Sequence, residues 1–420
     1  MNMDFKSQLK LALSTERMRL LHLVTDEATK RGLPLYIIGG SVRDVVLGRR
    51  LNDFDLTVEG NAIALARSLA SKHGGRVTAH TKFGTANWFL PNNLKADAEA
   101  QDTLDIISAR SETYKHPAAL PTVKLGSIDD DIRRRDFTIN ALAIRLDGSH
   151  FGELREDLNG MEDVQKGIVR VLHLRSFIDD PTRMYRAVRY EKRYEFKIAE
   201  DTLALIPEAR SLVEKLSAQR IRHELDLIIA EPNAVSMIAR LDDLELLAPI
   251  HPALSNFNQS NLATLKSDHA ALQNRQSRWI LWLMHLTGQE IEFVNARLHF
   301  TADLLKILRS ASLLTANQTA VVGLKPSQCV ELLEGYSLRA IETVYHVIPN
   351  GETKNKFSKY LSEWRHCKPK TTGHDLKRLG IPPGPKYTEI LHRLRAVWLD
   401  GEVKAEEEEL IMLDKLIHSG

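Results

Sequence analysis

Short apolar runs separated by polar residues mark the first 146 residues of the chain. Leu35–Ile38 is an uninterrupted apolar run, whereas Thr85–Leu90 and Thr103–Ile107 alternate between apolar and polar positions. Gly, Pro and Asn separate these runs, as expected for strands joined by turns. Further along, Leu203–Ile229 and Arg278–Leu286 carry apolar residues at helical spacing. The pattern predicts an α+β head followed by an all-helical part.

Segments that contain proline or glycine divide the helical part. Glu231–Asn233, Ala248–Pro252 and Lys368–Gly373 interrupt stretches with helical spacing, since both residue types break helices. Trp279 and Trp282 fall on apolar positions of one stretch, and we interpret them as core residues. We expect four regions, which cover residues 1–146, 147–232, 233–350 and 351–420.

The glycine pair after the first apolar run predicts a phosphate site. Gly39-Gly40 ends the expected strand just before Ser41, a residue type that favours helix N-caps. A helix is therefore expected to begin near Val42. Its unpaired backbone N–H groups and positive dipole end attract anions, and Arg43 adds a fixed charge beside them. A glycine pair that serves only as a packing turn is the simpler alternative.

Two aspartates separated by one residue follow. In Asn52–Val58 acidic and apolar residues alternate, which predicts a strand with Asp53 and Asp55 on one face. The same alternation places a third carboxylate, Asp105, on a neighbouring strand. All three are candidate catalytic residues, and Asp53 and Asp55 are candidate ligands for two Mg²⁺ ions, with Mn²⁺ as an alternative. A solvated strand edge is the simpler interpretation of two such aspartates taken alone.

Composition favours an intracellular protein. The chain has 420 residues, which allows several domains, and its only cysteines are Cys329 and Cys367, so a disulfide framework is not expected. Met1–Lys6 contains no apolar signal core, and no apolar run approaches the roughly 20 residues that span a bilayer. We expect a cytoplasmic protein without a membrane partner.

The net charge of +2 conceals an uneven distribution of charge. Between Arg365 and Arg395 there are eight lysines and arginines and only two acidic residues. Such clusters neutralise the phosphates of nucleic acids. Lys377, Arg378 and Lys386 are the candidate RNA-binding residues, with Lys386 at the start of an expected helix. A solvated helix face is the alternative.

Four blocks of the sequence resemble one known family. Tyr36–Val58 is similar to the signature of the class II tRNA nucleotidyltransferases and bacterial poly(A) polymerases, within the polymerase-β-like nucleotidyltransferases. Asp131–Ala141 resembles the family's ribose-recognition block, Asp179–Tyr190 its base-reading block and Leu216–Leu225 a later helix-stabilising block. The resemblance covers about the first 230 residues. It implies a head with a mixed sheet, followed by a helical neck, body and tail.

The resemblance also implies roles for individual residues. Asp136 is expected to accept a hydrogen bond from the ribose 2′-hydroxyl, with Arg135 near the triphosphate or base and Arg134 supporting the pocket. The other candidate nucleotide-binding residues are Gly39, Gly40, Arg43, Asn140, Asp180, Arg183, Arg186 and Arg189. Asp179 and Tyr190 stand where glutamate and phenylalanine are frequent in the family, and both changes are chemically mild.

Asp180 and Arg183 have a chemical logic of their own. Cytosine and adenine both present an amino donor beside a ring-nitrogen acceptor, whereas uracil and guanine present the reverse. An ionised aspartate only accepts and an arginine only donates. On a helix begun by Pro181, two side chains three residues apart share a face. The pair is therefore expected to select C and A, although an ordinary surface ion pair is the alternative.

The segment Arg110–Pro121 contains two prolines and mixed polarity, which predict a loop. The resemblance implies that a flexible loop stands here in enzymes that add the terminal adenosine and is reduced in enzymes that add only CC. Arg110 and Glu112 resemble the basic and acidic pair near its start. A plain connecting loop is the alternative.

Together these features predict a metal-dependent, template-independent nucleotidyltransferase that adds C and A from CTP and ATP to the 3′ end of tRNA, with CCA as its product. The alternatives are an enzyme that adds only the terminal A or only CC, a poly(A) polymerase, and a catalytically silent RNA-binding protein. Asp53, Asp55 and Asp105 argue against the last of these. The sequence leaves the oligomeric state open.

Overall fold

The chain divides into two units, seen in a computed structural model that describes residues 4–95, 102–113, 115–255, 272 and 274–418. The first unit contains residues 1–224 and 236–249, and the second contains residues 225–235 and 250–420. The residues assigned to the head and most of those assigned to the neck thus fall in one unit. None of the helices in the described ranges combines the length and apolarity that crossing a bilayer requires.

A seven-stranded mixed sheet organises the first unit, in the order β3-β4-β5-β2-β1-β8-β9. Only β2 and β5 are parallel neighbours, and the other pairs are antiparallel. The strands are β1 (Leu35–Ile38), β2 (Leu56–Val58), β3 (Arg76–His80), β4 (Thr85–Phe89), β5 (Thr103–Ser108), β8 (Ala143–Arg145) and β9 (Glu153–Arg155). The expected mixed sheet and α+β fold are confirmed.

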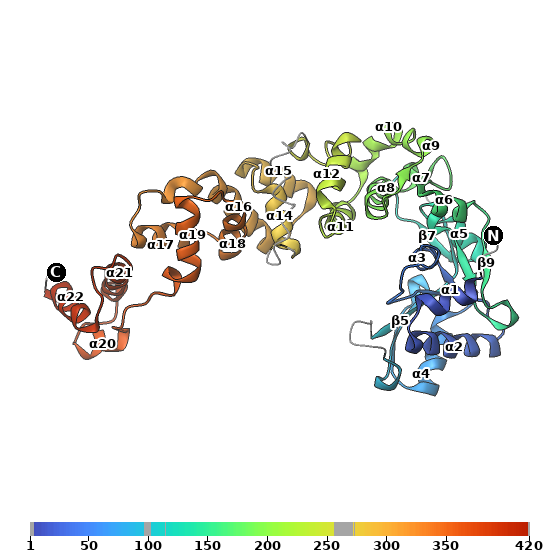
Figure 1. The fold of residues 1–420 in the computed structure, drawn as a ribbon, viewed down its shortest axis with the longest axis horizontal. Coiled ribbons are helices and arrows are strands. Elements are labelled where there is room, and N and C mark those ends of the chain that lie inside the picture. Colours follow the sequence, from blue (N-terminus) through green and yellow to red (C-terminus); the bar gives the residue numbers. More distant parts are fainter. Residues whose placement is uncertain (1–3, 96–101, 114, 256–271, 273, 419–420) are drawn as a thin grey trace. The chain divides into compact units, whose positions relative to one another are not determined.

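Helices cover the sheet and continue the chain beyond it (Figure 1). α4 packs against β3, β4 and β5, and α2 packs against α4. The helices of this part are α1 (Phe5–Ala12), α2 (Thr15–Lys30), α3 (Gly40–Val46), α4 (Ala62–His73), α5 (Ile128–Arg133) and α6 (Gly160–Lys166). Leu20, Leu21 and Val24 of α2 are fully buried, because they recur at helical spacing on the face toward the core.

The strands expected at Leu35–Ile38, Thr85–Leu90 and Thr103–Ile107 are confirmed as β1, β4 and β5. The strand expected over residues 52–58 is wrong in extent, because β2 covers only its last three residues. The carboxylate of Asp53 accepts a hydrogen bond of 2.9 Å from the backbone N–H of Phe54. Such a local bond competes with strand pairing. Asp53 and Asp55 therefore precede the strand, on either side of the buried Phe54.

The segment expected to be a loop from Arg110 to Pro121 is partly a strand. β6 (Arg110–Thr113) pairs antiparallel with β7 (Thr122–Leu125) in a separate two-stranded sheet. Polar residues at most positions hid the strand, since neither strand is deeply buried. We refer to residues 110–125 as the β6–β7 hairpin.

Short helices and a small parallel sheet follow. They are β10 (Ile168–Val169), α7 (Ser176–Asp179), α8 (Thr182–Arg193), β11 (Lys197–Ile198), α9 (Glu200–Leu203), α10 (Ile206–Ala209), α11 (Ala218–Ile229) and α12 (Ala234–Asp243). The continuous helix suggested by the spacing over Leu203–Ile229 is broken. A 3₁₀ turn over Arg210–Lys215 and an extended residue, Leu216, separate α10 from α11.

The second unit is helical, as expected. Its helices are α14 (Arg275–Leu283), α15 (Gly288–Leu298), α16 (Ala302–Ala316), α17 (Pro326–Glu334), α18 (Leu338–Val347), α19 (Glu352–Ser362), α20 (Gly373–Arg378), α21 (Pro385–Leu399) and α22 (Glu406–His418). Trp279 and Trp282 are buried and stacked at 5.2 Å between ring centroids, which confirms them as core residues. Leu376, Leu394 and Leu413 join α20, α21 and α22 through one apolar cluster.

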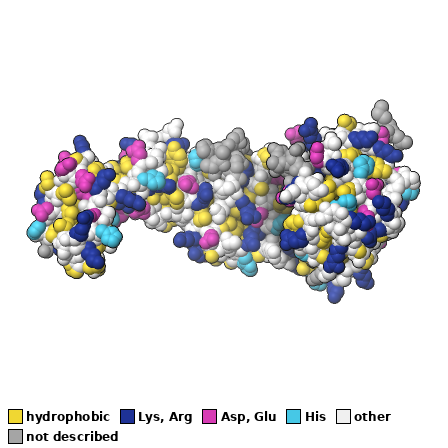
Figure 2. Space-filling view, turned by 90° about the horizontal axis from the view of Figure 1, so that it is seen from below, with side chains coloured by type: hydrophobic (Ala, Val, Ile, Leu, Met, Phe, Trp, Pro, Cys, Tyr) yellow, Lys and Arg dark blue, Asp and Glu magenta, His cyan; other side chains and the backbone are white. Residues whose placement is uncertain are grey.

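Basic and acidic side chains are interspersed on the visible face of the C-terminal helices (Figure 2). Arg378 is paired with Asp375, and Arg395 donates a hydrogen bond of 2.7 Å to Glu334. The acidic partners of these two arginines reduce the local positive charge. Lys377, Arg378 and Lys386 are nevertheless exposed to solvent.

Candidate active site

A cavity of about 830 Å³ in the first unit is lined by residues from α3, from the turn after α5, from α8 and from the start of α11. Positive charge dominates its lining, with eight arginines and five carboxylates. The arginines are Arg43, Arg134, Arg135, Arg183, Arg186, Arg189, Arg193 and Arg220. Such a lining suits a polyphosphate, because guanidinium groups bind phosphate oxygens through paired hydrogen bonds.

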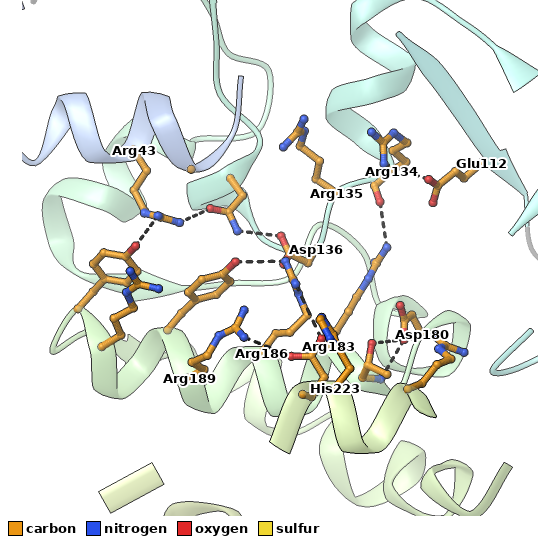
Figure 3. A pocket seen from close by; sticks show the side chains of 18 of the residues that line it. Arg43, Glu112, Arg134, Arg135, Asp136, Asp180, Arg183, Arg186, Arg189 and His223 are labelled. Carbon is orange, nitrogen blue, oxygen red and sulfur yellow. Dashed lines mark hydrogen bonds and ion pairs between the residues drawn. The ribbon is translucent and has the colours of Figure 1, made fainter. Parts of the chain in front are cut away.

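Nine of the ten residues predicted to bind nucleotide line this cavity, from three separate parts of the sequence. They are Gly40, Arg43, Arg135, Asp136, Asn140, Asp180, Arg183, Arg186 and Arg189. The tenth, Gly39, stands beside Arg135. Figure 3 shows Asp136 and the arginines converging on the same space from facing elements.

The turn before α3 differs from the expectation in one detail. The helix begins at Gly40, and its N-cap is Gly39, which has a φ of 77°. Ser41 therefore lies inside the first turn, and the expectation that it caps the helix is wrong. A left-handed φ is accessible to glycine without strain, which explains why the cap has no side chain.

Arg43 is buried and heavily bonded. Its Nη1 donates to Asn140 Oδ1 at 2.5 Å, and its Nη2 donates to the hydroxyl of Tyr194. The guanidinium carbon also lies 4.2 Å from the centre of the Tyr194 ring. These contacts fix the direction of the charge before any ligand arrives, which reduces the entropy lost on binding.

Asp136 is the centre of a second set of bonds. Its Oδ1 accepts from the N–H of Phe137 and from Asn140 Nδ2, both at 2.9 Å, and its Oδ2 accepts from Arg186 Nε at 2.8 Å and Nη2 at 2.5 Å. Burial alone raises the pKa of Asp136, but the charge of Arg186 and the hydrogen bonds hold it below its ordinary value. All four usual acceptor positions of the carboxylate are occupied.

Asp180 and Arg183 both face the cavity, but they are not paired with each other. Asp180 Oδ1 accepts from Thr182 N at 2.9 Å, from Thr182 Oγ1 at 2.5 Å and from Arg220 Nη2 at 2.6 Å. Arg183 donates to Ser176 Oγ at 2.7 Å and to the carbonyl of Arg134 at 2.9 Å. Each keeps unused acceptor or donor positions, since a carboxylate has two oxygens and a guanidinium has five N–H groups.

Several buried polar atoms of the cavity residues lack a hydrogen-bond partner. Among the described residues, Arg135 Nε, Arg189 Nε and Glu224 Oε2 are buried and make no hydrogen bond. Burial raises the pKa of Glu224, although Arg186 and Arg189 lie near it. Glu224 Oε2 lies 3.6 Å from Arg189 Nη1, whereas the Nε atoms of Arg135 and Arg189 are donors that a ligand in the cavity can satisfy.

The three candidate catalytic carboxylates lie outside the lining of this cavity but interact with one another. The pKa values of Asp53 and Asp55 are raised, first because the surrounding protein displaces water. Repulsion by Asp105 adds to both shifts, and Asp53 adds to that of Asp55. Arg135, which lines the cavity, partly offsets the shift at Asp55. The carboxylates and the cavity are therefore electrostatically coupled through Arg135.

This donor set fits a divalent cation in chemistry. In the described ranges, no three His, Cys, Asp or Glu side chains approach closely enough to hold a metal ion in their present conformations. The mutual repulsion of three carboxylates is nevertheless what a cation relieves, and carboxylate oxygens are its preferred ligands. Asn87 donates a hydrogen bond to Asp105 Oδ1, which orients that carboxylate from the neighbouring strand.

Sequence patterns missed several cavity residues. Tyr194 and Arg193 lie at the end of α8, and Arg220, His223 and Glu224 lie on α11. The repeat of Arg186, Tyr190 and Tyr194 at intervals of four residues was an available signal, because it places them on one helix face. Arg220 carried no such signal, since it belongs to a block interpreted as helix-stabilising.

The mixed sheet, the carboxylates before β2 and on β5 and the arginine-lined cavity define a polymerase-β-like nucleotidyltransferase. Residues 35–170 match the family described as the poly A polymerase head domain, and residues 195–258 match the family described as a probable RNA and SrmB binding site of polymerase A. The A-adding tRNA nucleotidyltransferase of Halalkalibacterium halodurans is 32% identical over 95% of this chain and 92% of its own length. The chain belongs to the tRNA nucleotidyltransferase family.

Two further similarities support this assignment. The A-adding tRNA nucleotidyltransferase of Geobacter sulfurreducens is 33% identical over 92% of the chain, which spans only 46% of that protein's length. The Thermotoga maritima CCA-adding enzyme complexed with tRNA has a TM-score of 0.75 at 27% identity, over 99% of this chain and 98% of that one.

Proposed function

We propose that the protein extends the 3′ end of tRNA with C and A nucleotides from CTP and ATP, and so builds the CCA end without a template. The observation that carries this proposal is the meeting of Asp180 and Arg183 with Arg43, Arg135 and Arg186 in one cavity. A candidate base acceptor and a candidate base donor thus line the same cavity as a cluster of candidate phosphate-binding groups.

The residues divide the substrate between them. The arginines bind the triphosphate, Asp180 accepts from the amino group of cytosine or adenine, and Arg183 donates to the adjacent ring nitrogen. A uracil or guanine would place a donor opposite Arg183 and an acceptor opposite Asp180, which leaves buried polar groups unpaired. The 3′ oxygen of the tRNA then attacks the α-phosphorus, and pyrophosphate leaves.

Mg²⁺ is the cofactor that we propose, with Asp53 and Asp55 as its ligands and Asp105 as the third carboxylate. When bound, such ions activate the attacking hydroxyl and stabilise the leaving pyrophosphate. Asp53 and Asp55 therefore act on the reacting groups, whereas Arg135 lines the cavity and its charge partly offsets the raised pKa of Asp55. We place this chemistry in the cytoplasm.

The hydrogen bonds that Asp136 already accepts restrict how it can bind a ribose. Its four acceptor positions are already filled by Phe137, Asn140 and Arg186. A ribose 2′-hydroxyl binds here only by replacing one of these donors. The exposed part of Arg186 is the most replaceable, since its side chain keeps 30% of its surface accessible.

Addition of only the terminal A is the second candidate function. Relatives more than 30% identical over most of this chain are named A-adding tRNA nucleotidyltransferases. The two candidates share the A step and differ in the use of CTP. The tail residues Lys377, Arg378 and Lys386 are proposed to bind tRNA in both cases.

The decisive experiment offers tRNA that ends at the discriminator base, at C or at CC, each with CTP, ATP, UTP or GTP, and sizes the products. Addition of CCA to the first substrate supports the main proposal. Extension of only the CC-ended tRNA, by A alone, supports the second candidate. A variant with Asp53→Ala and Asp55→Ala serves as the control for contaminating activity, and extension by that variant at the wild-type rate overturns the assignment.

A further inference from the structure

Arg220 joins the base acceptor to the β6–β7 hairpin. Its Nη2 donates to Asp180 Oδ1 at 2.6 Å, and its Nη1 donates to the carbonyl of Ala118 at 2.9 Å. Ala118 belongs to the connection between β6 and β7, 102 residues away in the sequence. One guanidinium therefore holds both a cavity residue and a backbone group of the hairpin.

The backbone around Ala118 is held in place by its surroundings. Ala118 has a φ of 61°, which a residue with a side chain adopts only when its surroundings hold it there. Its N–H donates to the carbonyl of Ile178 at 3.1 Å, two residues before Asp180. The connection is thus bonded to α7 through one backbone group and to Arg220 through the other.

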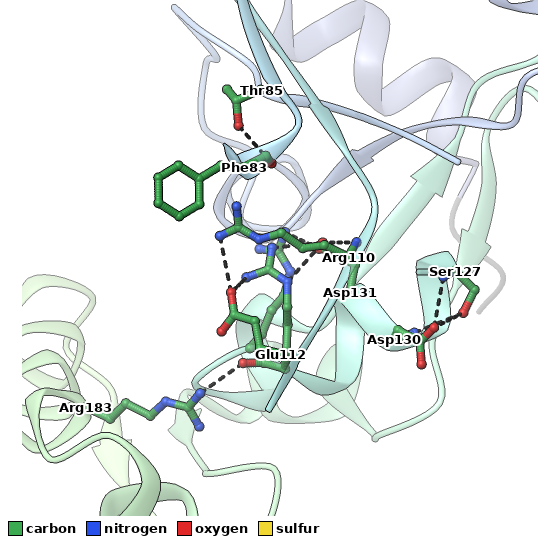
Figure 4. A network of polar contacts seen from close by, with 10 residues as sticks. Phe83, Thr85, Arg110, Glu112, Ser127, Asp130, Asp131 and Arg183 are labelled. Atoms are coloured by element: carbon green, nitrogen blue, oxygen red, sulfur yellow. Dashed lines mark hydrogen bonds and ion pairs between the residues drawn. The ribbon is translucent and has the colours of Figure 1, made fainter. Parts of the chain in front are cut away.

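A second chain of contacts links β6 of the hairpin to Arg183 through Arg134 (Figure 4). Glu112 on β6 accepts from Arg134 Nη1 at 3.0 Å, and Arg110 Nη2 lies 3.2 Å from the same oxygen. The backbone carbonyl of Arg134 in turn accepts from Arg183. Both members of the base-reading pair are therefore tied to this hairpin.

The hydrogen bond from Arg220 falls on the same oxygen of Asp180 that Thr182 already binds. All three hydrogen bonds that Asp180 accepts from the described residues fall on Oδ1. Two of them come from Thr182 on the same turn, and only Arg220 approaches from another element. Fixing Oδ1 from two sides restricts rotation of the carboxylate and leaves Oδ2 as the acceptor.

We propose that Arg220 is a positioning residue for base selection: it orients the carboxylate of Asp180 toward the incoming base and makes this orientation depend on the β6–β7 connection. The inference rests on the proposed function, because it assigns a role within the same nucleotide site. Arg220 itself does not contact the reacting atoms.

The first test compares Arg220→Ala and Arg220→Lys with Arg222→Ala, which removes an arginine from the same helix outside the cavity lining. ATP and GTP binding are measured by calorimetry without tRNA, and ATP and GTP transfer are measured with tRNA. Arg220→Ala is expected to lower the ATP preference over GTP about tenfold or more, since a bond to a charged group is lost. Arg220→Lys should restore part of the preference, and Arg222→Ala should keep all of it.

The second test reaches the same contact from the hairpin. Ala118→Pro cannot adopt a positive φ and has no N–H, so it displaces the carbonyl that Arg220 binds. It should lower the ATP preference as Arg220→Ala does, and the double variant should lose little more than either single variant. Thermal unfolding identifies which variants are folded. If Arg220→Ala is unfolded, the ATP preference of Arg220→Lys is compared with that of the wild type instead.

A folded Arg220→Ala variant with unchanged ATP preference overturns the inference. An equal loss of ATP and GTP use also overturns it, because a purely structural role would cause that result. Fully additive effects of Ala118→Pro and Arg220→Ala overturn the link to the hairpin. Wild-type protein that prefers ATP in binding but extends no tRNA overturns the proposed function alone.

Discussion

The guanidinium of Arg135 occupies the space in which a β-carbon on Gly39 would stand. Gly39 turns the chain with a φ of 77°, so a side chain there would be strained as well as obstructed. Because Arg135 lines the cavity and its charge also acts on Asp55, a side chain at Gly39 would disturb both groups.

Gly39→Ala is therefore expected to lower nucleotide transfer by at least tenfold, by displacing Arg135. Steady-state transfer rates and thermal unfolding measure the two effects separately. Gly48→Ala is the matched control, since Gly48 has a φ of 67° but no atom lies within 4 Å of the place that its β-carbon would take. That control should lose comparable stability, about 1 kcal/mol, and keep its activity. Equal activity in both variants would contradict the expectation.

Removing charge from the carboxylate group should stabilise the metal-free protein while it abolishes transfer. The folded protein binds protons at Asp53 and Asp55 more tightly than the unfolded chain does, because their pKa values are raised from 3.8. Their ionisation therefore costs stability above the raised pKa, and the cost disappears as the pH falls toward 3.8. Asp53→Asn and Asp55→Asn should raise Tm in EDTA at pH 7 by about 2 °C.

Calorimetry between pH 4 and 8 checks the sign, and the difference between wild type and variants should shrink at the acidic end. Addition of Mg²⁺ should raise the Tm of the wild type more than that of either variant. tRNA affinity should stay near the wild-type value, since phosphate contacts elsewhere hold the RNA. Variants that melt below the wild type in EDTA at pH 7 would show that the ionised carboxylates do not destabilise the metal-free protein.

Base selection should depend on Arg183. Arg183→Ala removes the donor that we propose to face the ring nitrogen, and it should lower the CTP preference over UTP by roughly 10- to 100-fold. Ser176→Ala removes only the acceptor at 2.7 Å that steadies Arg183, and it should have a smaller effect. Competition between paired nucleotides measures both ratios. A lower rate with unchanged ratios would assign Arg183 to support of α8 instead.

The β6–β7 hairpin should affect the A step more than the C step. Replacing Arg110 and Glu112 with alanine breaks the contact of Glu112 with Arg134, whereas deletion of residues 117–121 removes the connection. Either change should impair A addition to CC-ended tRNA more than C addition to shorter tRNA. Lys124→Ala on the exposed part of β7 is the control. Equal loss of both steps would mean that the hairpin only supports the structure.

Tail residues should contribute affinity without affecting chemistry. Alanine at Lys377, Arg378 and Lys386 should weaken tRNA binding and reduce the slope of log affinity against log salt by about 2. The transfer rate at saturating tRNA should not change. Alanine at Lys359, Lys404 and Lys415, which are also exposed on the tail, removes the same net charge and is the control. An unchanged salt slope in the triple variant would exclude these residues from the RNA contact.

The sequence was informative where structure depends on neighbouring residues. An uninterrupted apolar run located β1, and alternation of apolar and polar positions located β4 and β5. Local bonding explains the shortened β2, because Asp53 bonds to the next residue's backbone. Contacts such as Arg43 to Tyr194, 151 residues apart, and Arg220 to Ala118 depend on the packing of distant elements. No periodicity along the chain encodes them.

The β6–β7 hairpin forms its own small sheet, which affects where the chain can change in length. Its strands pair with each other and with no strand of the seven-stranded sheet in the described residues. Insertions or deletions between Thr113 and Thr122 therefore leave the register of the large sheet intact. Changes in this hairpin can still reach the nucleotide cavity, because Ala118 and Glu112 are linked to Asp180 and Arg183 through Arg220 and Arg134. A change in which nucleotides are accepted could therefore arise in this hairpin without a change in the pairing of the large sheet.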